Sequence, residues 1–169
     1  LPKDELKDIA NKAVINSAIN FFEMPLIWSQ DKKWLLEKSN KVHGNENLTS
    51  AFTKKNGVIV IIPHLGSWEF FGKYTSLNFP MTSMYQPPKL SNLDPLVKKG
   101  RESSGASLVP TNKTGIKKIL KALKSNELVA ILPDQVPKEG SGIYSNFFGI
   151  PAYTMNLVHN LLIKTSCEI

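Results

Sequence analysis

The stretch of sequence that decides the fold is Val58-Ile59-Val60-Ile61-Ile62, followed directly by Pro63-His64-Leu65-Gly66-Ser67-Trp68-Glu69. The run 58–62 is β-branched without a polar interruption, which is typical of a strand buried on both faces of a parallel sheet. Gly66 allows the backbone to approach closely, and Ser67 is suited to cap a helix that would hold Glu69 in its first turn. The stretch therefore predicts a strand, a loop and the start of a helix.

Beyond this stretch, strand-like and helix-like patterns alternate along the chain. Helices are expected over residues 67–77, 92–103 and 114–124, and strands over residues 81–85, 106–109 and 127–132. This alternation predicts the α/β class, with a central, largely parallel or mixed sheet flanked by helices. Loops are expected at Pro87-Pro88 and over residues 133–151. Residues 158–169 predict a helix followed by the first residues of a strand.

The N-terminal part of the chain has a different pattern. Apolar residues at mixed three- and four-residue spacing predict two or three amphipathic helices between residues 3 and 52. We therefore expect a helical segment over 1–52 and an α/β core over 53–169, together forming a single domain. An apolar cluster within 21–28, broken by Pro25, favours core packing over contact with a membrane.

Composition limits the class of protein. The 169 residues carry a formal net charge of +7, from 21 basic and 14 acidic residues. This favours an anionic partner such as a phosphorylated lipid, a membrane face or an acidic carrier protein, although a merely soluble surface is the simpler interpretation. The single cysteine, Cys167, cannot form an internal disulfide, and no stretch approaches about 18 continuous apolar residues.

His64 is the first candidate catalytic residue, because ligands bind where the strands of an α/β sheet end and loops lead into helices. Glu69, five positions later, is expected to reach the imidazole and hold it in one tautomer. The other ring nitrogen could then remove a proton from a hydroxyl. A structural histidine and a glutamate favoured by the helix dipole are the simpler alternatives. The spacing of the histidines does not predict a zinc site, and no phosphate-binding glycine motif is present.

Five blocks, in order along the chain, resemble the bacterial lipid A biosynthesis acyltransferases, the lauroyl and myristoyl transferases that add secondary acyl chains. The first is Pro63-His64-Leu65-Gly66-Ser67-Trp68-Glu69, which is similar to the His-x4-Glu block of that family. The others are Tyr85-Gln86-Pro87-Pro88, Arg101-Glu102-Ser103-Ser104-Gly105, Leu132-Pro133-Asp134-Gln135 and Asn146-Phe147-Phe148-Gly149-Ile150-Pro151-Ala152. The resemblance covers roughly residues 20–169.

The resemblance implies a glycerolipid-acyltransferase-like fold and an acyltransferase activity. An acyl chain would pass from an acyl-carrier-protein or coenzyme A thioester to a hydroxyl of a lipid A precursor. His64 would be the general base and Glu69 its partner, while Arg101 and Asp134 would bind substrate. No metal or bound cofactor would be needed, because the thioester is already activated. The implied partners are the carrier protein or coenzyme A thioester, the lipid A precursor and a membrane surface, with no nucleic acid.

The resemblance also implies a location at the cytoplasmic face of a Gram-negative inner membrane. Gln86 departs from the family, where arginine is usual. The family's N-terminal hydrophobic anchor and the C-terminal half of its domain have no counterpart in these residues, so the chain is expected to be a fragment of a longer protein.

Arg101 is distinctive on composition as well, because it is the one arginine among 21 basic residues. A planar guanidinium suits a phosphate or carboxylate, and Asp134 is expected to pair with it. The lysines at 117, 121 and 124 share one helix face, which favours a solvated surface over a docking site for an acidic carrier protein or anionic headgroups. Phe147-Phe148 favours core packing over a wall for the acyl chain.

The sequence leaves three alternatives open for the function of the chain. The first is an acyltransferase for another glycolipid or for a phospholipid, although Glu69 argues against the glycerophosphate branch, whose comparable motif ends in Asp. The second is a non-catalytic module that binds lipid or carrier protein. The third is a truncated product that does not fold alone.

Overall fold

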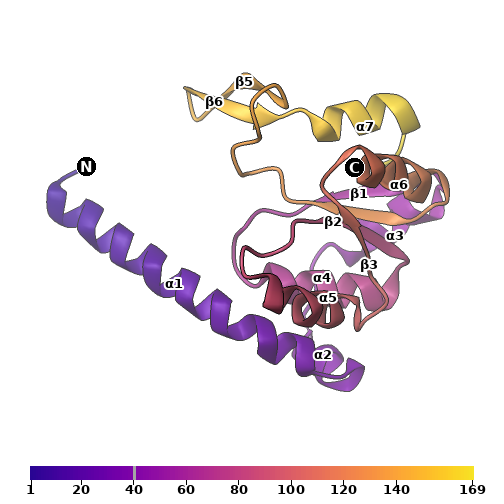
Figure 1. The fold of residues 1–169 in the computed structure, drawn as a ribbon, viewed down its shortest axis with the longest axis horizontal. Helices are drawn as coiled ribbons and strands as arrows, with labels where there is room; N and C mark the ends of the chain where they lie inside the picture. The colour runs from indigo at the N-terminus through magenta and orange to yellow at the C-terminus, as the bar shows by residue number, and fades with distance from the viewer. Residues whose placement is uncertain (40) are drawn as a thin grey trace.

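A four-stranded parallel sheet forms the centre of the molecule in the computed structural model, which describes residues 1–39 and 41–169 (Figure 1). Its strands are β1 (Val58–Ile61), β2 (Met81–Tyr85), β3 (Ser107–Pro110) and β4 (Leu128–Ile131), in the order β1-β4-β2-β3. Residues 58–61 pair with 128–131, and β2 pairs with both β4 and β3. All four strands run in the same direction, so their carboxyl ends lie along one edge of the sheet.

Helices cover both faces of this sheet, as the alternation predicts. On one face lie α6 (Lys113–Lys124) and α7 (Leu157–Thr165), which pack Ile119, Leu123 and Leu161 against Ile59 and Val129. On the other face, α4 (Trp68–Asn78) packs Trp68 and Phe71 near Leu128 and Ala130, and α5 (Asp94–Glu102) follows the short η1 turn (Ser91–Leu93). The predicted α/β class is confirmed.

The most buried strand is β4 rather than β1. All four residues of β4 are buried, whereas Ile61 in β1 is 47% exposed. An apolar run cannot distinguish a central strand from one near an edge, because both need one face against the core. Beyond β1, Glu168 forms an isolated parallel bridge with Val58, so the strand residues expected after the last helix are confirmed.

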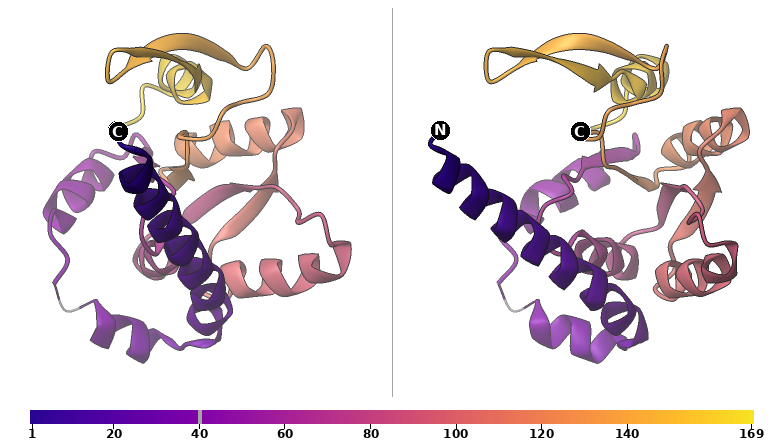
Figure 2. Two further views of the ribbon diagram at one scale, coloured as in Figure 1. Left: turned by 90° about the vertical axis from the view of Figure 1, so that its left-hand side faces the viewer. Right: turned by 60° about the vertical axis from the view of Figure 1, so that its left-hand side comes forward.

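The N-terminal segment contains three helices, α1 (Lys3–Ser29), α2 (Lys32–Lys38) and α3 (Asn45–Thr53). Most of α1 extends away from the sheet, and it contacts α4 and α5 near its C-terminal end (Figure 2). Ile27 is buried there, but Phe21 and Phe22 are 62% and 73% exposed. The prediction of core packing is therefore wrong for these two phenylalanines. No helix among the described residues has the length and apolar character that crossing a bilayer requires.

The expected loop over 133–151 is wrong in its second half. Strands β5 (Gly142–Phe147) and β6 (Ile150–Met155) form an antiparallel hairpin that stands away from the main sheet (Figure 2). Phe148 and Gly149 at its tip both have positive φ, as a tight hairpin turn requires. The glycines and prolines of this segment therefore belong partly to a β-hairpin with exposed faces, and not only to an irregular loop. Phe147 and Phe148 are 67% and 91% exposed, so the prediction that they pack in the core is also wrong.

Candidate active site

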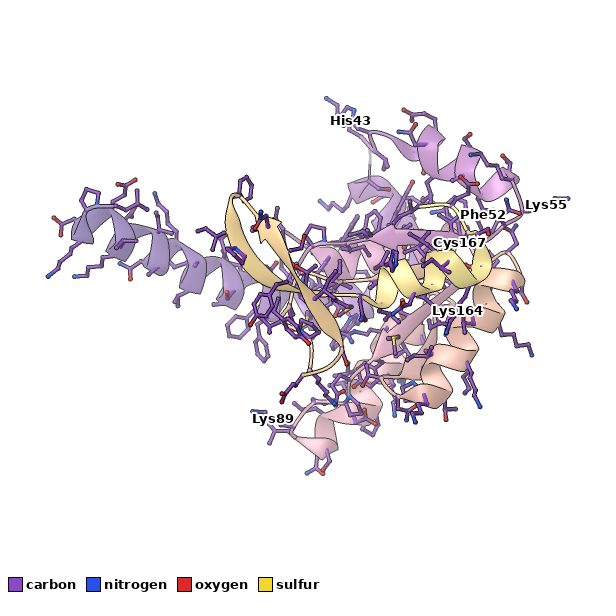
Figure 3. The ribbon with its side chains drawn as sticks, turned by 90° about the horizontal axis from the view of Figure 1, so that it is seen from above. His43, Phe52, Lys55, Lys89, Lys164 and Cys167 are labelled. Atoms are coloured by element: carbon purple, nitrogen blue, oxygen red, sulfur yellow. The ribbon has the colours of Figure 1, made fainter. Side chains whose placement is uncertain are left out.

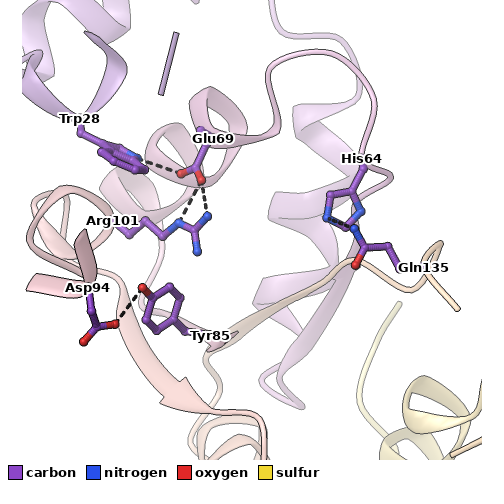
Figure 4. Close-up of polar contacts among 7 residues, drawn as sticks. All are labelled: Trp28, His64, Glu69, Tyr85, Asp94, Arg101 and Gln135. Carbon is purple, nitrogen blue, oxygen red and sulfur yellow. Dashed lines mark hydrogen bonds and ion pairs between the residues drawn. The ribbon is translucent and has the colours of Figure 1, made fainter. Parts of the chain in front are cut away.

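The four predicted site residues lie at or near the carboxyl edge of the parallel sheet, and Figure 4 shows three of them, His64, Glu69 and Arg101. His64 lies in the loop between β1 and α4, and Glu69 lies in the first turn of α4. Arg101 is on α5, which follows β2, and Asp134 follows β4. Gly66 has a φ of +62°, a left-handed conformation that glycine adopts readily, and its turn leads the chain from His64 into α4.

His64 pairs with Asp134. One carboxylate oxygen of Asp134 lies 2.8 Å from Nδ1 of the imidazole, and the other accepts the His64 backbone N–H at 2.6 Å. Partial burial raises the pKa of Asp134, but the hydrogen bonds from His64 outweigh it and hold this pKa below its ordinary value. An ionised carboxylate only accepts hydrogen bonds, so Nδ1 donates to Asp134, and in the neutral imidazole the lone pair is then on Nε2.

The second ring nitrogen of His64, Nε2, lies in a partly exposed region beside Gln135. The His64 and Asp134 side chains are 32% and 39% exposed. The ring also contacts the Trp68 ring edge-to-face, with centroids 5.5 Å apart, and this contact limits its rotation. Nε2 lies 3.4 Å from the side-chain amide nitrogen of Gln135. The arrangement leaves a basic nitrogen, fixed in direction, beside a hydrogen-bond donor.

Glu69 has other partners. One of its oxygens accepts hydrogen bonds from Nε and Nη2 of Arg101, at 2.9 and 2.5 Å, and the other accepts one from Trp28 Nε1 at 2.9 Å. Its side chain is only 8% exposed. The carboxylate is therefore enclosed between the N-terminal helix and α5, with both oxygens engaged.

Aromatic rings hold Arg101 on both sides. Its guanidinium carbon lies 5.4 Å from the centroid of the Trp68 ring and 5.3 Å from that of Tyr85, distances typical of cation–π contacts. Gly100, the preceding residue, allows Trp28 to come close, since a Cβ there would lie 2.5 Å from the Trp28 ring. The orientation of Arg101 is therefore set by Glu69 and by two rings.

Tyr85 is fixed in turn by Asp94. Its hydroxyl donates to Asp94 at 3.0 Å, and Lys98 donates to the other oxygen of that carboxylate at 2.7 Å. Burial and the hydrogen bond to Asp94 raise the pKa of Tyr85 to about 12. Tyr85 therefore stays neutral and serves as a wall for Arg101.

A buried lysine holds α1 against this region. Lys73 on α4 donates to the carbonyl oxygens of Ile27, Trp28 and Gln30, at 2.9, 2.9 and 2.6 Å, so it caps the C-terminal end of α1. Burial lowers the pKa of Lys73. These bonds place Trp28 over Glu69, and they connect the N-terminal helix to the site.

The pairing differs from the one expected from the sequence. His64 was expected to meet Glu69, and Asp134 to meet Arg101; among the described contacts, His64 pairs with Asp134 and Glu69 with Arg101. Figure 4 shows His64 and Glu69 directed toward different partners. The physical reason is strand order, because β4 is the direct neighbour of β1 and brings Asp134 beside His64.

The sequence did not identify Trp28, Lys73 or Gln135 as members of this region. Gln135 could have been found, because it directly follows Asp134 at a strand end. Lys73 lies one helical turn after Glu69 on α4, but the two side chains have separate partners. Trp28 lies far from the site in sequence, and no pattern in its own neighbourhood points to Glu69.

Among the hollows that border the site, two are large. One, of about 470 Å³, lies between α1 and α5 and is lined by apolar side chains together with Arg101. The other, of about 610 Å³, lies between α6, α7 and the strand ends and includes Gln86 and Gln135. The described residues bring together no group of three or more His, Cys, Asp or Glu side chains that could hold a metal ion.

Comparison with known proteins gives consistent matches. The sequence model of the family described as "Bacterial lipid A biosynthesis acyltransferase" matches residues 2–169. The "Lipid A biosynthesis palmitoleoyltransferase" of Escherichia coli (strain K12) is 29% identical over 122 residues, which are 72% of this chain and 38% of that protein. A "Lipid A biosynthesis acyltransferase" of Haemophilus influenzae is 23% identical over 170 residues, covering 98% of this chain and 52% of the relative. The chain thus spans about half or less of these relatives.

Proposed function

The chain belongs to the bacterial lipid A biosynthesis acyltransferase family, and we propose that it transfers an acyl group from a thioester to a hydroxyl of a lipid A precursor. The proposed donor is an acyl-carrier-protein or coenzyme A thioester. The observation that carries this proposal is the His64–Asp134 pair at the carboxyl edge of the sheet, in which Nδ1 faces the carboxylate and both side chains are partly exposed.

In the proposed reaction, Asp134 keeps the hydrogen on Nδ1 and Nε2 accepts the proton of the acceptor hydroxyl. The hydroxyl oxygen then attacks the thioester carbonyl and forms a tetrahedral oxyanion. As this intermediate collapses, the C–S bond breaks and the proton on Nε2 passes to the departing sulfur. The products are an ester and a free thiol, and Asp134 stabilises the imidazolium between the two steps.

Gln135 and Arg101 are proposed to serve the substrates. The Gln135 amide lies beside Nε2, where it can donate to the acceptor oxygen or to the oxyanion. Arg101, held by Glu69 and by two rings, presents a fixed guanidinium to an anionic group of the acceptor. In this proposal Asp134 and Glu69 are positioning residues, Asp134 acting through His64 and Glu69 through Arg101.

Exposed aromatic residues support a membrane-surface location for the reaction. Phe21 and Phe22 on α1, and Phe147 and Phe148 at the hairpin tip, present their rings to the surroundings. A lipid acceptor would be met at such a surface, and we propose the cytoplasmic face of the bacterial inner membrane as the place of action.

The test is turnover of a lipid A precursor with acyl-carrier-protein and coenzyme A thioesters of several chain lengths. We expect His64→Ala to reduce turnover by a factor of about 1,000 or more, at least as much as any change that acts through His64. His159→Ala is the matched control, since His159 is exposed on α7, and it should retain full activity. Full activity in the His64→Ala protein would contradict the proposed base. Binding of lipid or carrier protein without turnover would favour a non-catalytic binding module. Turnover of another glycolipid or of a phospholipid, without turnover of the lipid A precursor, would mean that the proposed acceptor is wrong.

A further inference from the structure

Helix α6 carries an unusual concentration of positive charge. Five of its residues are lysines and none is acidic, and all five side chains are exposed. We call these residues the α6 lysine row: Lys113, Lys117, Lys118, Lys121 and Lys124. Among the described residues, no carboxylate lies within ion-pair distance of any of them, so the charge of the row is not neutralised.

Only part of this charge suits the helix: Lys121 and Lys124 lie in the last turn, where positive charge complements the helix dipole. Like charges at spacings of three and four residues repel, and a lysine in the first turn opposes the helix dipole. In each of three other helices at least one lysine pairs with an acid four residues away: Lys12 with Asp8 in α1, Lys33 with Glu37 in α2, and Lys98 with Asp94 in α5. The α6 lysine row therefore calls for an explanation other than stability.

The apolar side of α6 is already occupied. Ile119, Ala122 and Leu123 are buried against the sheet, and none of the large exposed apolar side chains belongs to α6. A helix that enters a bilayer interface needs a free apolar face, and α6 has none. The exposed aromatic residues that suit lipid lie elsewhere, on α1 and on the β5–β6 hairpin. The charge on α6 thus fits an acidic protein better than a lipid surface.

The row also borders a route to the catalytic pair. Ile116 and Leu120 of α6 line the hollow of about 610 Å³, as does Gln135, whose amide contacts His64. A sixth exposed lysine, Lys164, lines the same hollow from α7, which packs along α6 (Figure 3). A partner bound to the row would therefore lie beside a groove of mixed polar and apolar lining that reaches Gln135, the neighbour of Nε2 of His64.

We propose that the α6 lysine row, with Lys164, docks an acidic helix of the protein that carries the acyl thioester, and that the groove admits the thioester arm to His64. This inference rests on the proposed function and specifies the partner of the same site. Complementary charge would guide the encounter and fix the register of the partner, so its contribution should weaken as salt concentration rises.

The test compares two charge reversals that have the same net effect. The double variant Lys117→Glu/Lys121→Glu changes the row, and Lys3→Glu/Lys7→Glu changes two exposed lysines at the same spacing on α1. For each protein we would measure KM with an acyl thioester of the acidic carrier protein and with acyl-N-acetylcysteamine, a small thioester without a carrier. Titration with unacylated, phosphopantetheine-bearing carrier protein and with anionic lipid vesicles gives binding directly.

We expect the α6 variant to raise KM for the carrier-protein thioester by about tenfold or more and to weaken carrier binding equally. In the α6 variant, turnover of the small thioester and binding to vesicles should stay at the level of the parent protein. The α1 variant should match the parent protein in all of these measurements. Unchanged carrier binding in the α6 variant would overturn the proposal, as would equal losses in both variants or a loss of vesicle binding alone. If the parent protein turns over neither thioester, the proposed function fails, while carrier titration still decides the docking surface.

Discussion

The two ion pairs at the carboxyl edge of the sheet differ in how they are enclosed. In the His64–Asp134 pair both side chains are about a third exposed, and the imidazole nitrogen that does not face Asp134 contacts only the Gln135 amide among the described hydrogen bonds. In the Arg101–Glu69 pair the carboxylate is 8% exposed, both of its oxygens are engaged, and rings cover the guanidinium. The first pair suits proton exchange, which needs access. The second suits a fixed charge, which needs rigidity.

The partners of each pair also differ in origin. His64 and Asp134 follow neighbouring strands, so the sheet itself brings them together. Glu69 and Arg101 lie on helices α4 and α5, and Trp28 of α1 completes their contacts. The His64–Asp134 pair thus depends on the core, whereas the Arg101–Glu69 pair depends also on the docking of the N-terminal helix.

The largest expected effect is on enzyme activity, and it distinguishes the role of Asp134 from that of Glu69. Asp134→Asn should reduce kcat by roughly 1,000-fold or more, because the amide can stabilise the wrong imidazole tautomer and cannot stabilise the imidazolium. Glu69→Gln should act mainly by misplacing Arg101, so we expect a smaller loss, expressed chiefly in KM for the lipid acceptor. Steady-state kinetics of the two variants with the same donor measures this difference. A larger kcat loss in Glu69→Gln would reverse the assignment.

For the free energy of unfolding we expect the opposite order, with a larger loss from a substitution in the Arg101–Glu69 pair than from one in the His64–Asp134 pair. Arg101→Ala leaves a buried carboxylate without its ionic partner, which should lower the free energy of unfolding by about 3 kcal/mol. His64→Ala removes a partner from a more exposed carboxylate, and we expect a loss of about 1 kcal/mol or less. Chemical denaturation of both variants gives the values. Similar losses in the two proteins would mean that the pairs are equally solvated, contrary to the enclosure described above.

Trp28→Phe tests the link to the N-terminal helix. The change keeps most of the ring but removes the hydrogen bond to Glu69, and it should cost roughly 1–2 kcal/mol of unfolding free energy. Acceptor KM should rise in parallel, since Arg101 loses part of its support. Trp34→Phe is the control, because Trp34 has no hydrogen bond to either pair among those described. Equal effects of the two substitutions would break the proposed link.

The smallest effect concerns acid stability. The pKa of Asp134 is lowered in the folded protein, so its contribution to stability is present above the ordinary pKa of an aspartate and is lost as pH falls through the folded value. We expect Asp134→Asn to remove a modest decrease in stability between about pH 5 and pH 2. Thermal denaturation as a function of pH measures it. An unchanged pH profile in the variant would contradict the strong hydrogen bonds to His64.

Much of the fold was predictable because each strand and helix of the core has a local pattern. Three patterns predict local structure directly: the β-branched run 58–62, the apolar run at 128–131 and the spacing of apolar residues within α6. The four predicted site residues do gather at one edge, as parallel topology requires. What the sequence could not specify was the order of the strands, and therefore which of the four residues would touch.

The errors have a common physical cause. The exposed rings of Phe21, Phe22, Phe147 and Phe148 were expected in the core, since apolar residues are usually buried. A single amino-acid sequence does not predict how far a helix or hairpin, such as α1 or β5–β6, projects from the sheet. The hairpin was missed because its glycines and prolines are as typical of loops as of turns between short strands.

The central claim is that Asp134, rather than Glu69, fixes the tautomer of His64. Nitrogen NMR of selectively labelled histidine measures this directly, with His64→Ala used to assign the signal and His43 and His159 as internal references. We predict that His64 carries its hydrogen on Nδ1 in the parent protein and in Glu69→Gln, and that Asp134→Asn abolishes this preference. A tautomer that changes in Glu69→Gln but persists in Asp134→Asn would contradict the account.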